Sequence, residues 1–63
     1  MPNEMRQTYK VLSDAEKSVL ADLKDKGQAL YDAIEACGQS RELSLAKTKT
    51  EEAVMWAVKH ITK

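Results

Sequence analysis

The sequence predicts an all-α protein, an antiparallel two-helix hairpin with a short N-terminal arm or helix that assembles as a homo-oligomer. Apolar residues recur at steps of three and four in both halves of the chain, which is the period of one helix face. Gly38 and Ser40 lie between the two periodic stretches, and these residue types end one helix and begin another. With 63 residues, the chain forms a single hairpin domain over residues 1–63.

Residues 1–12 are the least regular part of the chain and form the predicted arm. Asn3 could cap a short helix in which Met5, Tyr9 and Leu12 share a face. The same residues could equally stay extended until an oligomer orders them. The sequence leaves both conformations open.

The first long helix is predicted over residues 13–37. It begins at a capping box, since the Ser13 hydroxyl can accept from the Glu16 amide while the Glu16 carboxylate reaches back. Gly27 lowers helix propensity by about 1 kcal/mol relative to alanine, so it indicates close approach of another backbone or a ligand. The apolar face predicted to pack on the second helix consists of Leu20, Leu23, Gly27, Leu30, Ile34 and Cys37.

After a turn at residues 38–40, the second long helix is predicted over residues 41–62. The face predicted to pack on the first helix consists of Leu43, Ala46, Thr50, Ala53, Ala57 and Ile61. Val54, Met55, Trp56 and Val58 fall on other sides of the same turns. A helix that is apolar nearly all round is buried nearly all round, and one partner helix cannot cover it. We therefore expect other copies of the chain to cover the remainder, as small domains often need.

Composition argues against several classes of partner. Ten basic and ten acidic residues cancel, so the net charge gives no indication that the chain binds DNA or RNA polymers. The longest apolar run, residues 53–58, is far shorter than a membrane span. Cys37 has no disulfide partner in the chain, and with His60 it gives too few ligands for a zinc site. We expect no membrane, no metal and no cofactor.

No arrangement of residues typical of catalysis is present, so we do not expect an enzyme. Cys37 and His60 would lie at opposite ends of an antiparallel hairpin, too far apart for a nucleophile and its base. Taken alone, Lys24 and Lys26 are most simply solvated helix lysines. Tyr9 is most simply an arm residue packing on a neighbour, and Trp56 part of an oligomer core.

The stretch from Arg41 to Ile61 resembles the second arm of the phage anti-CBASS cyclic-oligonucleotide sponges, a family whose helical hairpin is shared with sponges that antagonise Thoeris defence. A Lys-x-x-Gly step at Lys24 to Gly27 matches the first arm. Where many members have Leu-Gln, this chain has Thr50-Glu51. The residues of the second arm that carry the resemblance are Arg41, Ala46, Lys47, Thr48, Met55, Lys59 and Ile61.

The resemblance implies a homohexamer that sequesters cyclic oligonucleotide messengers without cleaving them, in the cytoplasm of the infected bacterial host. CBASS effectors would then stay inactive. For cyclic dinucleotides such as cGAMP, it implies Tyr9 against a base and Lys24 on phosphate, with Lys26 as the alternative lysine. It also implies a separate pocket for cyclic trinucleotides, for which Arg41 and Thr48 are the candidates.

A second interpretation comes from a different class of protein. The chain could be a structural or regulatory hairpin that docks its apolar second helix onto a protein partner. Its lysines would then be ordinary surface residues. A binding panel of cyclic di- and trinucleotides separates the two interpretations.

Overall fold

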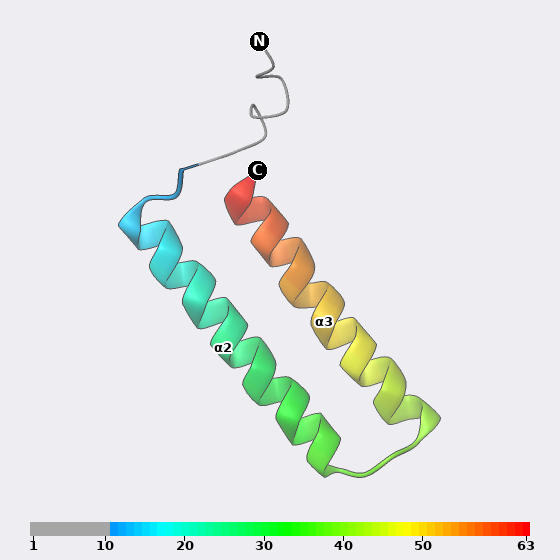
Figure 1. The fold of residues 1–63 in the computed structure, drawn as a ribbon. Coiled ribbons are helices and arrows are strands. Elements are labelled where there is room, and N and C mark those ends of the chain that lie inside the picture. The colour runs from blue at the N-terminus through cyan, green and yellow to red at the C-terminus, as the bar shows by residue number, and fades with distance from the viewer. Residues whose placement is uncertain (1–10) are drawn as a thin grey trace.

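The structure, a computed structural model that describes residues 11–63, is a pair of antiparallel helices (Figure 1). Helix α2 spans Asp14–Ala36 and helix α3 spans Arg41–Thr62. No β-strand occurs in the described part of the chain, so the all-α hairpin is confirmed there. The arm predicted at residues 1–12 lies almost wholly outside the described residues. None of the helices in residues 11–63 is long and apolar enough to cross a membrane.

Both helices begin at the serines that the sequence indicates. The Ser13 Oγ accepts from the Glu16 amide at 3.1 Å, and the Glu16 carboxylate accepts from the Ser13 amide at 2.9 Å, so the predicted capping box is confirmed. Ser40 Oγ accepts from the Leu43 amide at 3.0 Å. Gly38 has φ +123°, a left-handed conformation that glycine adopts without strain, and this lets the chain turn between the helices.

Helix α3 packs directly onto α2 at Gly27. A Cβ atom on Gly27 would overlap Cγ2 of Val54, so Val54 fills the space that the missing side chain leaves. The sequence predicts close approach of a backbone or a ligand at Gly27, and the structure places the Val54 side chain of the other helix there. The predicted packing face is wrong in detail, because Leu30 is 53% exposed and Ala53 is also exposed. Their neighbours Tyr31 and Val54 are half-buried instead.

Helix geometry explains why Tyr31 and Val54 are covered in place of Leu30 and Ala53. Steps of three and four residues from Gly27 lead to Leu30 and Tyr31, which both lie near the same helix face. A single neighbouring helix contacts only a narrow strip of the helix surface, which we call the packing line. Of two adjacent residues, the neighbouring helix covers the one that lies closer to this line. The same holds on α3, where Val54 lies across from Gly27 and Ala53 turns to the side.

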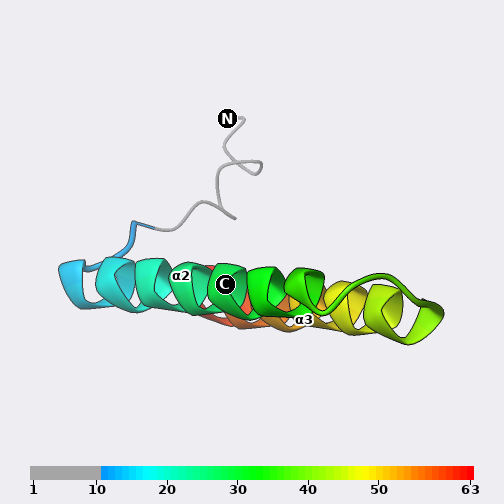
Figure 2. The ribbon, with the colours of Figure 1, turned by 90° about the horizontal axis from the view of Figure 1, so that it is seen from below.

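The hairpin is one helix thick, 12 Å in the thinnest direction of its Cα atoms, and Figure 2 shows it edge-on. Within residues 11–63 no apolar residue is buried, and Thr50 is the only buried residue. The Thr50 hydroxyl donates to the Ala46 carbonyl at 2.8 Å, which satisfies it. Large apolar side chains remain exposed, among them Met55 and Trp56. This exposure fits the expectation that one hairpin does not cover its own second helix.

Candidate ligand site on the hairpin

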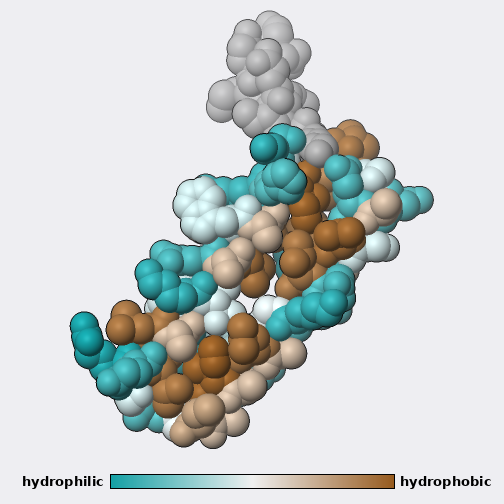
Figure 3. Space-filling view, turned by 180° about the vertical axis from the view of Figure 1, so that it is seen from behind, coloured by the Kyte–Doolittle hydropathy of each residue, from teal (hydrophilic) through white to brown (hydrophobic). Residues whose placement is uncertain are grey.

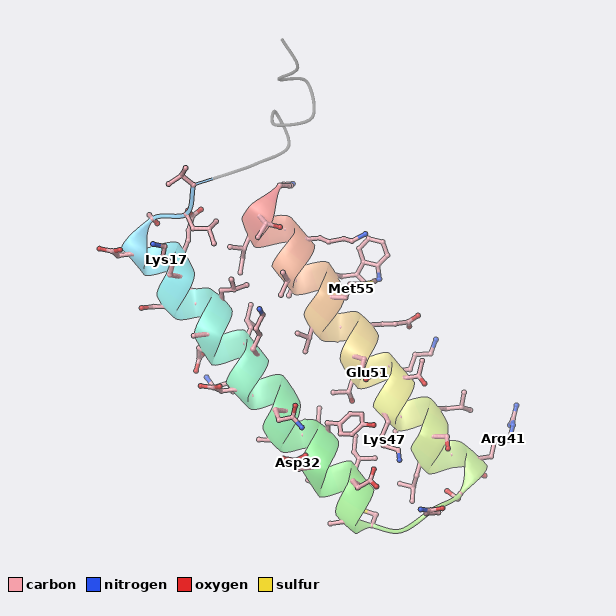
Figure 4. All side chains as sticks on the ribbon, viewed as in Figure 1. Lys17, Asp32, Arg41, Lys47, Glu51 and Met55 are labelled. Atoms are coloured by element: carbon pink, nitrogen blue, oxygen red, sulfur yellow. The ribbon has the colours of Figure 1, made fainter. Side chains whose placement is uncertain are left out.

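The hairpin has two faces of different chemistry, divided by the contact between Gly27 and Val54. We call the recess on one face the polar groove: it measures about 290 Å³ and is lined by Gly27, Gln28, Tyr31, Thr50, Glu51 and Val54. The apolar groove lies on the other side of that contact, measures about 230 Å³, and is lined by Leu23, Lys26, Gly27, Leu30, Thr50, Ala53, Val54 and Ala57. Figure 3, seen from behind, shows apolar side chains gathered along the two helices. Figure 4 shows Lys47 on the side of α3 that faces α2.

Lys24 and Lys26 lie on different sides of α2. Two residues rotate a helix by about 200°, so neighbouring lysines of this spacing point almost opposite ways. Lys26 lines the apolar groove, and its Nζ is paired with Asp22 at 2.8 Å. This hydrogen bond raises the pKa of Lys26.

Lys24, in contrast, shares a face of α2 with Gln28 and Tyr31, which follow it by four and seven residues and line the polar groove. Its side chain makes no salt bridge within residues 11–63. Of the two candidate lysines, Lys24 is therefore the one that brings an unpaired positive charge to the polar side of the hairpin.

A cross-helix contact lies at one end of the polar groove. Lys47 Nζ on α3 donates to the Glu35 carboxylate on α2 at 2.8 Å, and it lies 5.8 Å from the centre of the Tyr31 ring. The hydrogen bond to Glu35 raises the pKa of Lys47, and the negative charge of Glu51 raises it further. Because the Lys47 side chain joins the two helices and lies beside the Tyr31 ring, it is only 20% exposed.

Arg41 and Thr48 are both exposed on α3. Arg41 is the first residue of the helix, at the turn end of the hairpin, and Figure 4 shows it pointing away from α2. Thr48 follows seven residues later, so it lies on the same side of α3. The structure thus keeps this pair apart from Lys24, in the middle of α2. Tyr9, the remaining candidate, lies outside the described residues.

The polar groove contains residues that sequence reasoning did not single out for ligand binding: Gln28, Tyr31, Thr50 and Glu51. Gln28 and Tyr31 follow Lys24 at helical spacing, and Thr50 and Glu51 lie in one turn of α3. Such spacing is common on helices, so it identifies these residues as a site only when the contact between the two helices is known. Thr50 and Glu51, where the chain departs from the family pattern noted above, both line this groove. No group of three or more His, Cys, Asp or Glu that could hold a metal occurs in residues 11–63.

Over residues 11–63 the protein is thus a small helical hairpin with no buried apolar residue and with a polar recess on one face. The sequence profile of the family described as Acb2/Tad1, hairpin domain, matches residues 1–62, and the chain belongs to this family. The resemblance seen in the sequence is thereby confirmed. The family consists of phage anti-defence sponges, which bind cyclic nucleotides. Comparisons with curated proteins and with solved structures give no match.

Proposed function

We propose that this protein is a phage anti-defence sponge that binds cyclic oligonucleotide messengers and releases them uncleaved, so that CBASS effectors are not activated. The family match over residues 1–62 carries the proposal. Sequestration needs affinity for the messenger, and the family binds its ligands rather than converting them. The site of action is the cytoplasm of the infected bacterial host, where such messengers are made.

The proposed principal ligand is a cyclic dinucleotide such as cGAMP. The polar groove, at about 290 Å³, is at the lower limit for small-molecule pockets, which run from about 300 to 1,000 Å³. One hairpin therefore holds only part of such a ligand. A two-fold assembly supplies each residue twice, so two copies of Lys24 meet two phosphates and two copies of Tyr9 stack on two bases. Stacking contributes about 1–3 kcal/mol per base.

We propose a homohexamer as the assembly that completes these sites. The exposed side chains of Met55 and Trp56 supply apolar surface for contacts between copies. Trp56 alone is 61% exposed, although aromatic side chains contribute strongly to interfaces when they are covered. In an assembly with a threefold axis, Arg41 and Thr48 would line a second pocket, where a guanidinium can pair with a phosphate of a cyclic trinucleotide.

The test is isothermal calorimetry with cGAMP on the wild type and on two matched variants. Lys24→Ala should weaken binding by about tenfold or more, because an ion pair with phosphate is lost. Lys26→Ala is the control: it removes a lysine paired with Asp22 on the other face, and binding should stay within about twofold. Ligand recovered after denaturation should chromatograph as the intact cyclic compound. Absence of heat with every cyclic di- and trinucleotide would refute the sponge.

Docking onto another protein is the second candidate function. The apolar groove favours it, because Leu23, Leu30 and Ala53 line it without burying each other. A protein that is monomeric by light scattering and binds no cyclic nucleotide would support this candidate over the sponge.

A further inference from the structure

We propose that the polar groove receives a guanine base and that Glu51 is the residue that selects it. The inference rests on the proposed function and goes further by naming the base that the messenger must carry.

The floor of the groove lies where the two helices meet at Gly27 and Val54. Gly27 has no side chain, and Val54 fills the space beneath it, so the floor is apolar and lacks projections. The Tyr31 ring forms part of the wall and is bordered by Lys47 at 5.8 Å. A space of about 290 Å³ accepts one base with some solvent, whereas a whole cyclic dinucleotide exceeds it.

The polar rim of the groove is rich in acceptors. The Glu51 carboxylate makes no hydrogen bond and no salt bridge within residues 11–63, and an ionised carboxylate only accepts. Thr50 has already committed its hydroxyl hydrogen to the Ala46 carbonyl. Gln28 donates through Nε2 to Asp32 at 2.9 Å, which holds its amide at the rim. Glu51 thus lines the groove with a carboxylate that accepts no hydrogen bond within residues 11–63 and whose charge acts on Lys47.

Guanine is the purine that matches two adjacent acceptors. Its Watson–Crick edge presents N1–H beside the 2-amino group, so one carboxylate can accept two parallel hydrogen bonds from it. Adenine presents an amino group beside the N1 lone pair, and that lone pair would face a carboxylate oxygen. Such two-point contacts to a base edge are the ones that discriminate between bases.

Two lysines, Lys47 and Lys24, supply positive charge near the Glu51 carboxylate, so a phosphate can bind on the same side of the hairpin. Lys47 lies between Glu35 and Glu51, and the charges of both glutamates raise its pKa after the hydrogen bond to Glu35. Lys24 is unpaired and lies two helical turns from Tyr31 on the same face, about 10 Å along the axis. A base in the groove therefore leaves its phosphate within reach of the flexible Lys24 side chain.

The experiment compares cyclic di-GMP, cyclic di-AMP and cyclic di-IMP by calorimetry on the full-length protein. The wild type should bind cyclic di-GMP about tenfold more tightly than cyclic di-AMP. Cyclic di-IMP lacks the 2-amino groups and should bind more weakly than cyclic di-GMP. In Glu51→Gln, which offers one donor and one acceptor, the preference for guanine should fall to about twofold or less. Glu52→Gln is the matched control, because Glu52 pairs with Lys49 and is not among the groove residues.

The outcomes separate this inference from the proposed function. If the wild type binds all three ligands equally, or if Glu51→Gln keeps the full preference, the guanine site is refuted while the sponge stands. If no cyclic nucleotide binds, both fail together. An unchanged oligomer mass and helical circular dichroism in Glu51→Gln show that a lost preference does not come from misfolding. Loss of the preference in Glu52→Gln as well would also refute the assignment to Glu51.

Discussion

Replacing Gly27 with alanine tests the packing between the two helices. In an exposed helix this change stabilises by about 1 kcal/mol, because alanine loses less backbone entropy. Here the new Cβ would overlap Cγ2 of Val54. Valine in a helix strongly prefers one rotamer, so its methyl group does not rotate away at low cost. Overpacking of this kind costs about 1–3 kcal/mol. We expect Gly27→Ala to lower the free energy of unfolding by about 1 kcal/mol net.

The assay is urea denaturation followed by circular dichroism, at one fixed protein concentration because assembly would couple stability to concentration. Val54→Ala and the double variant complete a double-mutant cycle. The double variant removes the overlap, so the coupling between the two sites should be favourable by about 1–2 kcal/mol. Ser18→Ala, at an exposed position of α2, is the control for helix propensity and should stabilise slightly. Our account of the packing is wrong if Gly27→Ala stabilises as Ser18→Ala does and shows no coupling to Val54.

Three further predictions concern the turn, the cross-helix contact and the outer face. Gly38→Ala should lower the free energy of unfolding by about 1 kcal/mol in urea denaturation, since a side chain is strained at φ +123°; no change would contradict the role of the turn. The raised pKa of Lys47 means that its pairing stabilises fully below pH 10.5 and is lost as pH rises through the folded-state pKa. Glu35→Gln should therefore be less stable than the wild type from neutral pH up to pH 10.5, and equal pH profiles would argue against the contact. Trp56→Ser should lower the mass measured by light scattering, and an unchanged assembly would exclude Trp56 from the interface.

The fold could be predicted because its signals are local. The capping box at Ser13 and the glycine at 38 are read from a few adjacent residues, and the structure confirms both. The sequence could not predict which individual residues of α2 face α3. Leu30 and Tyr31 differ by one position in a helical period of 3.6, and only the position of α3 decides between them. Heptad reasoning selected the aliphatic residue, and the structure half-buries the aromatic one.

The candidate site depends on the packing line. Lys24 and Lys26 are equivalent in the sequence, but once the helices meet at Gly27 they fall on opposite faces, one unpaired and one held by Asp22. Glu51 gave no signal by itself, because a glutamate on a helix is ordinarily a solvated charge. Its place in the polar groove follows only from the pairing of two segments distant in the chain.

A hairpin one helix thick also has a consequence for how such a protein evolves. Because almost every side chain of residues 11–63 reaches solvent within a single copy, most substitutions on the polar face leave the helices intact. Exposed substitutions usually change stability by less than about 0.5 kcal/mol. At the proposed base site, a change at Glu51 or Gln28 would therefore alter the preferred ligand without first needing compensation elsewhere. If a host changes its signalling molecule, a hairpin with so few buried positions can change its ligand preference through single substitutions.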